Sequence, residues 1–239
     1  MTKVSYETQA YSPACFDTLR YLEDAQKELE SRNLTREGLR PVRELFHKHN
    51  VQKQLGLTIL HRHFNMAANE RLVEYGKVTT PWLLESGEIF GGKIVPRGWA
   101  LHQGELYPTE FGFNPLGDTT YPDITFASEF VSELKDLFSK LKLDDLFGLT
   151  VLDNGNPLEM PGVERTIGRV SLNIPFQEGE SNNTVEAVWT FGCHESLDNS
   201  TVWPALSTDP LEIRYMYRYL LFTLDSVSKY LFSRRRIRE

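Results

Sequence analysis

The sequence predicts an α+β fold in which a helix-plus-antiparallel-sheet module, written α-β-β-β-β, occurs twice and forms a curved sheet or barrel. Three observations lead to this prediction. Along the 239 residues, each of two helical periodicities is followed by a run of short strand-like segments. Residues 42–60 recur without gaps as residues 134–152. The connections between the strand-like segments look too short for parallel crossovers, which favours antiparallel pairing.

The N-terminal part is expected to be helical after a loose arm. Ser12 and Pro13 provide an N-cap and a first-turn proline for a helix over 14–31, whose leucines fall at helical spacing. A second helix restarts at Pro41 and ends at Asn50, a residue type that tolerates the left-handed conformation of a helix end.

Short strands then follow, separated by turns and glycines, and the predicted ranges are 55–64, 71–78, 82–89, 93–95 and 99–113. The loop 114–123 is rich in Pro, Gly, Asp and Thr and divides the first repeat, approximately 36–113, from the second, approximately 124–203. Both repeats are expected to form one domain, 1–239.

The second repeat opens with the clearest internal helix, 124–143, which carries a wide apolar stripe. Its predicted strands are 148–152, 166–175 and 185–191. The chain then enters a long helix over 209–235, where Asp209, Pro210 and Glu212 supply the N-cap, the first-turn proline and the capping-box glutamate. The N-terminal and C-terminal helices are expected to pack on the sheet.

Seven of the nineteen positions in 42–60 are identical to those in 134–152. The same register pairs Gly76 with Gly168, and a small adjustment pairs Trp99 with Trp189. Two unrelated helix–strand units would also share apolar positions. The ordered recurrence of Leu-Phe-x-Lys, then Gly-Leu-Thr, favours duplication, and duplication would bring equivalent strand ends to a common hollow.

The candidate site follows from this hollow. His61 and His63 are two positions apart, so on a strand they share a face and can give two ligands to one metal ion. Asp153 occupies the repeat position of His61, and His194 lies near that of His102. The predicted catalytic residues are therefore His61, His63, Asp153 and His194, with His61 and His63 as the candidate ligands of a divalent metal. There are two alternatives. The histidines could act in acid–base catalysis without a metal, or they could simply form a polar strand edge with no function.

Composition and motifs exclude several classes. The net charge of −7 disfavours nucleic acid and anionic membranes, apart from the basic cluster Arg234–Arg238. No P-loop, dinucleotide fingerprint or serine nucleophile elbow occurs in the sequence. No apolar run approaches the roughly 18 residues of a membrane span. Two cysteines and a polar N-terminus predict a protein of a reducing compartment, the cytoplasm.

The stretches Leu60-His61-Arg62-His63-Phe64, Val73-Glu74-Tyr75-Gly76 and Gly162-Val163-Glu164-Arg165-Thr166 resemble a group of uncharacterised fungal proteins with an LHRHF…VEYG signature. The resemblance spans much of residues 50–190 and implies a fungal source. No activity is attached to that group, so the resemblance assigns no functional residue.

The sequence therefore favours a small-molecule enzyme, or a ligand-binding protein, with a histidine-containing and metal-competent pocket between the two repeats. The alternative is a non-catalytic interaction or scaffold protein that uses the amphipathic helix 209–235 to bind a partner. The same helix is the candidate interface of a homodimer.

Overall fold

The computed structural model describes residues 4–34, 37–86, 91–152, 162–175, 184–191 and 202–206. All of them belong to one compact unit, Met1–Leu206. Asp153, His194 and the predicted helix 209–235 lie outside the described residues.

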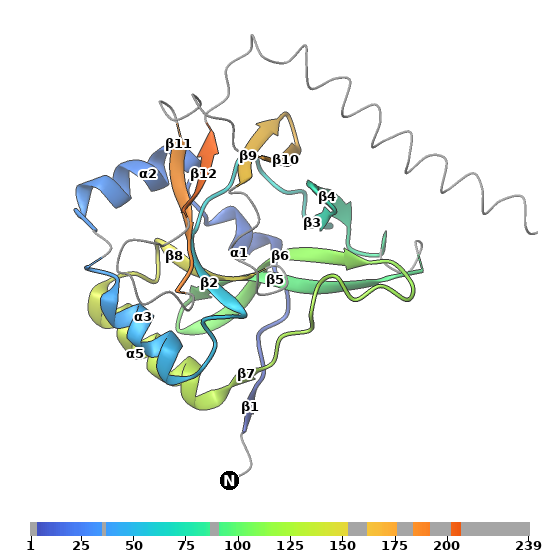
Figure 1. Ribbon diagram of the computed structural model, residues 1–239. Coiled ribbons are helices and arrows are strands. Elements are labelled where there is room, and N and C mark those ends of the chain that lie inside the picture. The colour runs from blue at the N-terminus through green and yellow to red at the C-terminus, as the bar shows by residue number, and fades with distance from the viewer. Residues whose placement is uncertain are drawn as a thin grey trace, which may run out of the picture. The chain divides into compact units, whose positions relative to one another are not determined.

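The described strands build a mixed α+β structure around one strongly curled sheet (Figure 1). Ten strands pair in the order β10-β4-β3-β6-β5-β8-β2-β11-β12-β9, and β9 pairs with β10, so the sheet closes into a barrel. Their bounds are β2 (Leu55–Ile59), β3 (Glu70–Tyr75), β4 (Val78–Leu83), β5 (Lys93–His102), β6 (Glu105–Asn114), β8 (Phe147–Val151), β9 (Gly162–Ile167), β10 (Val170–Pro175), β11 (Thr184–Trp189) and β12 (Val202–Leu206). The short strands β1 (Ser5–Tyr6) and β7 (Phe126–Ala127) form a separate two-stranded sheet.

The expectation of a wholly antiparallel sheet with four strands in each module is wrong in two respects. β3 pairs with β6, and β12 with β9, in parallel. Two strands intervene between the members of each pair, which gives the chain the length to return in the same direction. The predicted single strand 99–113 is a hairpin, because Gln103 and Gly104 both adopt positive φ, 50° and 78°, as a tight turn requires.

Four described helices accompany the barrel: α1 (Pro13–Asp17), α2 (Leu22–Ser31), α3 (Arg40–Lys48) and α5 (Ser128–Leu141). The predicted helix 14–31 is two helices. The Thr18 hydroxyl donates to the carbonyl of Cys15 at 2.7 Å at the end of α1, and Tyr21 is extended and pairs with Arg62. The chain therefore leaves the helical conformation and runs extended at Tyr21, beside Arg62, before α2 begins.

Three of the helices, α2, α3 and α5, pack on the outer face of the barrel. Leu57, Trp99, Leu149 and Trp189 point toward them and belong to the same buried cluster. The Phe46 ring is fully buried and meets the edges of Phe130 and Phe191, and α3 and α5 lie side by side in Figure 1. Burying a large apolar side chain of this kind contributes about 1.5–3 kcal/mol, so this layer fixes which face of the sheet becomes the barrel interior.

The two halves of the barrel have corresponding surroundings. Exchanging β2 with β8, β3 with β9, β4 with β10, β5 with β11 and β6 with β12 leaves every neighbour relation unchanged. Leu57 lies opposite Leu149, and Thr79 lies opposite Ser171. The members of both pairs are equivalent positions in the register that relates 42–60 to 134–152.

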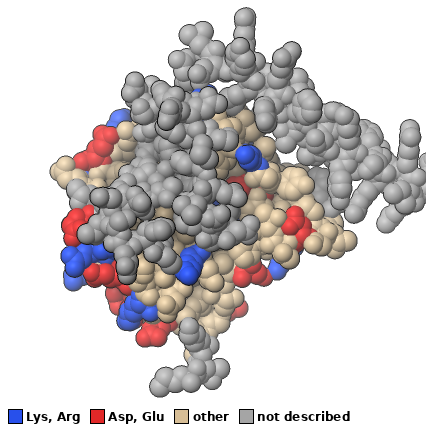
Figure 2. All heavy atoms as spheres, viewed as in Figure 1, with Lys and Arg blue, Asp and Glu red and all other residues tan. Residues whose placement is uncertain are grey.

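The described surface mixes the two signs of charge. In Figure 2, Lys and Arg side chains lie beside Asp and Glu side chains at the lower left, where Figure 1 shows α3 and α5. Lys48 binds Glu133 at 2.5 Å across these helices. Within the described part of the chain, no helix has both the length and the apolar character that crossing a bilayer requires.

Candidate metal centre

Strand register places several polar side chains inside the barrel. Cross-strand partners point to the same face of a sheet. Glu110 is paired with Leu72 of β3 and Gly98 of β5, and Gly98 is paired with Thr150, on the face opposite the helices. On the other side of the barrel Ser171 pairs with Thr79 and Thr166. The interior face therefore carries Glu74, Glu110, Glu164, Thr166 and Ser171.

His61 lies just beyond the end of β2 and is held by its own strand. Its Nδ1 is 3.0 Å from the carbonyl oxygen of Ile59. A carbonyl oxygen only accepts hydrogen bonds, so Nδ1 carries the proton and Nε2 presents a lone pair. Only 10% of the side chain is exposed, which fixes the ring in an orientation suited to binding a metal through Nε2.

His63 and Glu164 lie close to Nε2 of His61. Nε2 of His63 lies 3.2 Å from Nε2 of His61 and 3.4 Å from Oε1 of Glu164. The second Glu164 oxygen, Oε2, is 3.9 Å from Nε2 of His61. One ligand atom from each residue thus falls within 4.8 Å of the others. The Glu164 side chain is 36% exposed, whereas those of His61 and His63 are 10% and 15% exposed, so solvent reaches the cluster at Glu164.

Two of the three separations fit ligands that share one ion. Two ligand atoms at about 2.0–2.1 Å from a metal lie roughly 2.9 Å apart in octahedral geometry and roughly 3.4 Å apart in tetrahedral geometry. The 3.2 Å between the two imidazole nitrogens falls between these values, and the 3.4 Å from His63 to Glu164 equals the larger. The 3.9 Å from Glu164 Oε2 to His61 Nε2 exceeds both values, so the Glu164 carboxylate has to move toward His61 to share the ion. Two imidazoles and one carboxylate also form a recognised donor set for zinc and non-haem iron.

Electrostatics prepare two of these ligands, His61 and Glu164, for a cation. Burial alone would raise the pKa of Glu164, but the hydrogen bond and charge of His63, the charge of His61 and a hydrogen bond from Ser171 lower that pKa to about 2. Burial lowers the pKa of His61, against the attraction of Glu164. Burial also opposes protonation of His63, but Glu164 outweighs it and raises the pKa of His63. The lowered pKa values keep His61 neutral and Glu164 ionised near neutral pH, as metal ligands must be, whereas the raised pKa of His63 means that this residue gives up its proton when a metal binds.

Glu110 is a second carboxyl group on the interior face. Burial, followed by the charge of Glu164, raises the pKa of Glu110 to about 7. Nearby, Arg97 pairs with Glu74, and both side chains are largely buried. The Tyr121 hydroxyl donates to Glu74 Oε1 at 2.9 Å. The interior thus combines an ionised ligand, Glu164, with a carboxyl group that is largely protonated below pH 7.

The structure brings together only some of the predicted site residues. His61 and His63 lie side by side, although not on a strand as expected, since β2 ends at Ile59. Asp153 and His194 are outside the described residues. His102 lies at the end of β5, with its ring 5.9 Å from the ring of Tyr107, and is not a member of the metal-competent cluster.

Glu164 was missed as a candidate ligand. Its neighbours gave a partial signal, because a buried apolar Val163 beside a charged residue places Glu164 on the opposite face of its strand. Glu164 lies beside His63 because β9 pairs with β10 and β12 and so closes the barrel. Glu164 and His63 are far apart in the sequence, so no local pattern predicts this contact.

Comparisons with known proteins give no match from which a function could be transferred. No protein-family model matches the chain, no curated protein matches it, and no solved structure matches it. The resemblance to uncharacterised fungal proteins stays a prediction, and the His61–His63–Glu164 cluster is the feature from which a function is to be inferred.

Proposed function

We propose that this protein is a metal-dependent enzyme that acts on a small molecule inside the barrel. The observation that carries the proposal is the convergence of His61 Nε2, His63 Nε2 and a Glu164 oxygen within 4.8 Å of one another. The ion is a divalent transition metal, because imidazole nitrogens combined with one carboxylate select zinc or iron over magnesium and calcium.

A catalytic role is favoured over a structural one by the number of ligands among the described residues and by the exposure of Glu164. Structural zinc sites are closed by four protein ligands, whereas catalytic sites use three and leave a position for water or substrate. The described residues supply three ligands, and the side chain of one of them, Glu164, is 36% exposed. When bound, the metal would supply Lewis acidity toward a substrate oxygen or a water molecule.

The surroundings of the site suit proton transfer on a small substrate. A closed barrel of ten strands is wider than the eight-stranded barrels that hold one small ligand. Glu110 faces this interior, and its pKa of about 7 lets it give or take a proton near neutral pH. A Lewis-acidic ion beside such a carboxyl group supports lyase or isomerase chemistry next to a carbonyl group.

Metal analysis of the purified, untagged protein tests the proposal. The wild type is expected to hold one metal ion per chain, and this metal is expected to disappear in the double variant His61→Ala, His63→Ala and in Glu164→Gln. His102→Ala is the matched control, because His102 lies outside the cluster and should leave the metal in place. Wild-type protein that takes up no stoichiometric zinc, iron(II) or cobalt(II) would refute the proposal.

One observation favours a second candidate, metal-free acid–base catalysis. Nε2 of His63 lies 3.4 Å from Glu164, which raises the pKa of the imidazole, the arrangement of a general base with its carboxylate partner. A wild type without metal, but with a ligand-induced rise in melting temperature that is lost in His63→Gln, would favour this candidate. The scaffold alternative and the homodimer rest on helix 209–235, outside the described residues.

We also propose that the barrel arose by duplication of one module, a helix followed by five strands. Three observations support this: the unchanged strand neighbours after exchange of the halves, the pairs Leu57–Leu149 and Thr79–Ser171, and the hairpin glycines Gly76 and Gly168, whose φ angles are 64° and 61°. An experimental structure in which α3 and β2–β6 fail to superpose on α5 and β8–β12 would refute it.

A further inference from the structure

The segment 17–21, from the last residue of α1 to the residue before α2, holds the backbone that carries the two histidines. The Arg62 N–H donates to the carbonyl of Arg20 at 2.8 Å, and Tyr21 and Arg62 form a parallel bridge. The Arg62 guanidinium donates to the carbonyl of Asp17 at 2.6 Å and lies 4.7 Å from the centre of the Tyr21 ring. Arg62 stands between His61 and His63, so these contacts fix the peptide units on which both imidazoles depend.

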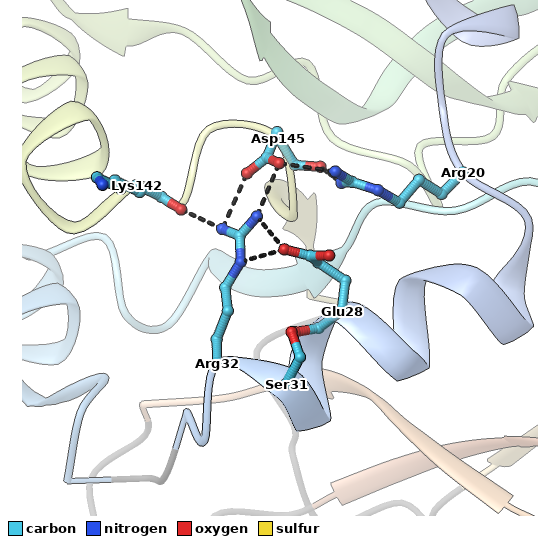
Figure 3. Close-up of polar contacts among 6 residues, drawn as sticks. All are labelled: Arg20, Glu28, Ser31, Arg32, Lys142 and Asp145. Atoms are coloured by element: carbon cyan, nitrogen blue, oxygen red, sulfur yellow. Dashed lines mark hydrogen bonds and ion pairs between the residues drawn. The ribbon is translucent and has the colours of Figure 1, made fainter.

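The same segment is anchored to the loop that precedes β8. The Arg20 guanidinium donates to the backbone carbonyl of Asp145 at 2.6 Å and to its carboxylate at 2.8 Å, as Figure 3 shows. The next residue, Leu146, accepts a hydrogen bond from the Leu60 N–H at 2.8 Å. The contacts Leu60–Leu146, Asp145–Arg20 and Arg20–Arg62 therefore close a ring around the backbone of His61.

Asp145 is the branch point of this ring. Its carboxylate also binds Arg32, beyond the end of α2, at 3.0 and 2.8 Å, and Arg32 in turn binds Glu28 and the carbonyl of Lys142 (Figure 3). Burial opposes ionisation of Asp145, but the two arginines outweigh it and lower its pKa. One carboxylate thus ties the α1–α2 connection and the α5–β8 loop to the segment that carries the histidines.

We propose that Asp145 is a positioning residue for the metal centre. Its ion pair with Arg20 keeps the segment 17–21 against Arg62, and this holds His61 and His63 at the separation that one metal ion needs. The inference builds on the proposed metal site. Asp145 touches no ligand atom, and it acts through the backbone, as outer residues that orient metal ligands do.

Metal titration of the full-length Asp145→Asn variant tests the inference. Zn²⁺ affinity, measured by competition with a chromophoric chelator, is expected to fall roughly tenfold, as for other residues that orient ligands. The visible absorption of bound Co²⁺ should change as well, because it reports ligand geometry, which a purely structural ion pair would not alter. Asp24→Asn is the matched control: it breaks the exposed pair with Lys27 on α2 and should leave both readouts unchanged.

Two further variants keep the outcome clear. Arg20→Gln removes the same ion pair while Asp145 keeps Arg32, so it serves if Asp145→Asn does not fold, and Asp145→Glu should restore part of the affinity. Wild-type affinity and spectrum in both Asp145→Asn and Arg20→Gln would overturn the positioning role and leave the metal site standing. A wild type that binds neither Zn²⁺ nor Co²⁺ would overturn the metal site and the positioning role together.

Discussion

Replacing Glu110 with glutamine is expected to stabilise the metal-free protein at alkaline pH. Burial, then the charge of Glu164, raises the pKa of Glu110 to about 7, compared with 4.5 for an exposed glutamate. The folded chain therefore binds this proton more tightly than the unfolded chain. The stabilising contribution is complete below about pH 4.5 and is lost as the pH rises through 7.

The size of the effect follows from the two pKa values. One pKa unit corresponds to about 1.4 kcal/mol, so the gap between 4.5 and 7 corresponds to roughly 3 kcal/mol. Glu110 is partly buried, so solvent reduces this figure, which is an upper limit. Glutamine has a similar shape and no charge at any pH. The Glu110→Gln variant should therefore exceed the wild type in unfolding free energy by up to about 3 kcal/mol at pH 8.5 and by little at pH 4.5.

Urea unfolding between pH 4.5 and 8.5, with a chelator present, measures both proteins in the metal-free state. Glu44→Gln is the control, because Glu44 is exposed and, among the described residues, pairs with Arg40 on the helix surface, a contact that contributes little to stability. Equal stability of Glu110→Gln and the wild type at pH 8.5, or a gap that does not shrink toward pH 4.5, would show that the interior accepts the ionised carboxylate.

Three further predictions concern the site and the core. Ser171→Ala removes a hydroxyl that lies 2.7 Å from the Thr166 hydroxyl and hydrogen-bonds to Glu164, so Zn²⁺ affinity should fall roughly tenfold in a competition titration; an unchanged affinity would contradict this. Phe46→Ala should lower the unfolding free energy by about 3–5 kcal/mol in urea, because the ring is fully buried, and a loss below about 1 kcal/mol would mean that the site collapses without cost. Gly112→Ala places a methyl group against the Tyr121 ring and should cost about 1–3 kcal/mol in the same assay, whereas wild-type stability would mean that the ring moves freely.

Part of the site was predictable because it is local in sequence. His61 and His63 are close enough along the chain that almost any extended conformation brings their rings together, so the rings lie side by side even though β2 ends before them. Their role as metal ligands stays a prediction. Glu164 was not predictable, because its position depends on β9 lying between β10 and β12. Asp153 was inferred from the repeat position of His61, and that inference stays a prediction.

The same distinction holds for the fold. The periodic apolar stripe of 124–143 predicted α5, since helical spacing is visible among residues that are close in the sequence. The break between α1 and α2 was missed, because Tyr21 leaves the helix to pair with Arg62, a residue far along the chain. The parallel contacts of β3 with β6 and of β9 with β12 were missed for the same reason, since no local pattern records which strands become neighbours.

The position of β8 between β5 and β2 has a consequence for how the chain acquires its structure. The N-terminal half cannot close its own sheet, because the hydrogen-bonding edge of β5 is satisfied only when residues 147–151 arrive, and β2 in turn is shared with β11. The first strand of each half, β2 or β8, thus lies between two strands of the other half. Such non-local pairing makes assembly slow. Two separately expressed fragments, divided in the loop 115–123, should each remain unstructured until they are mixed.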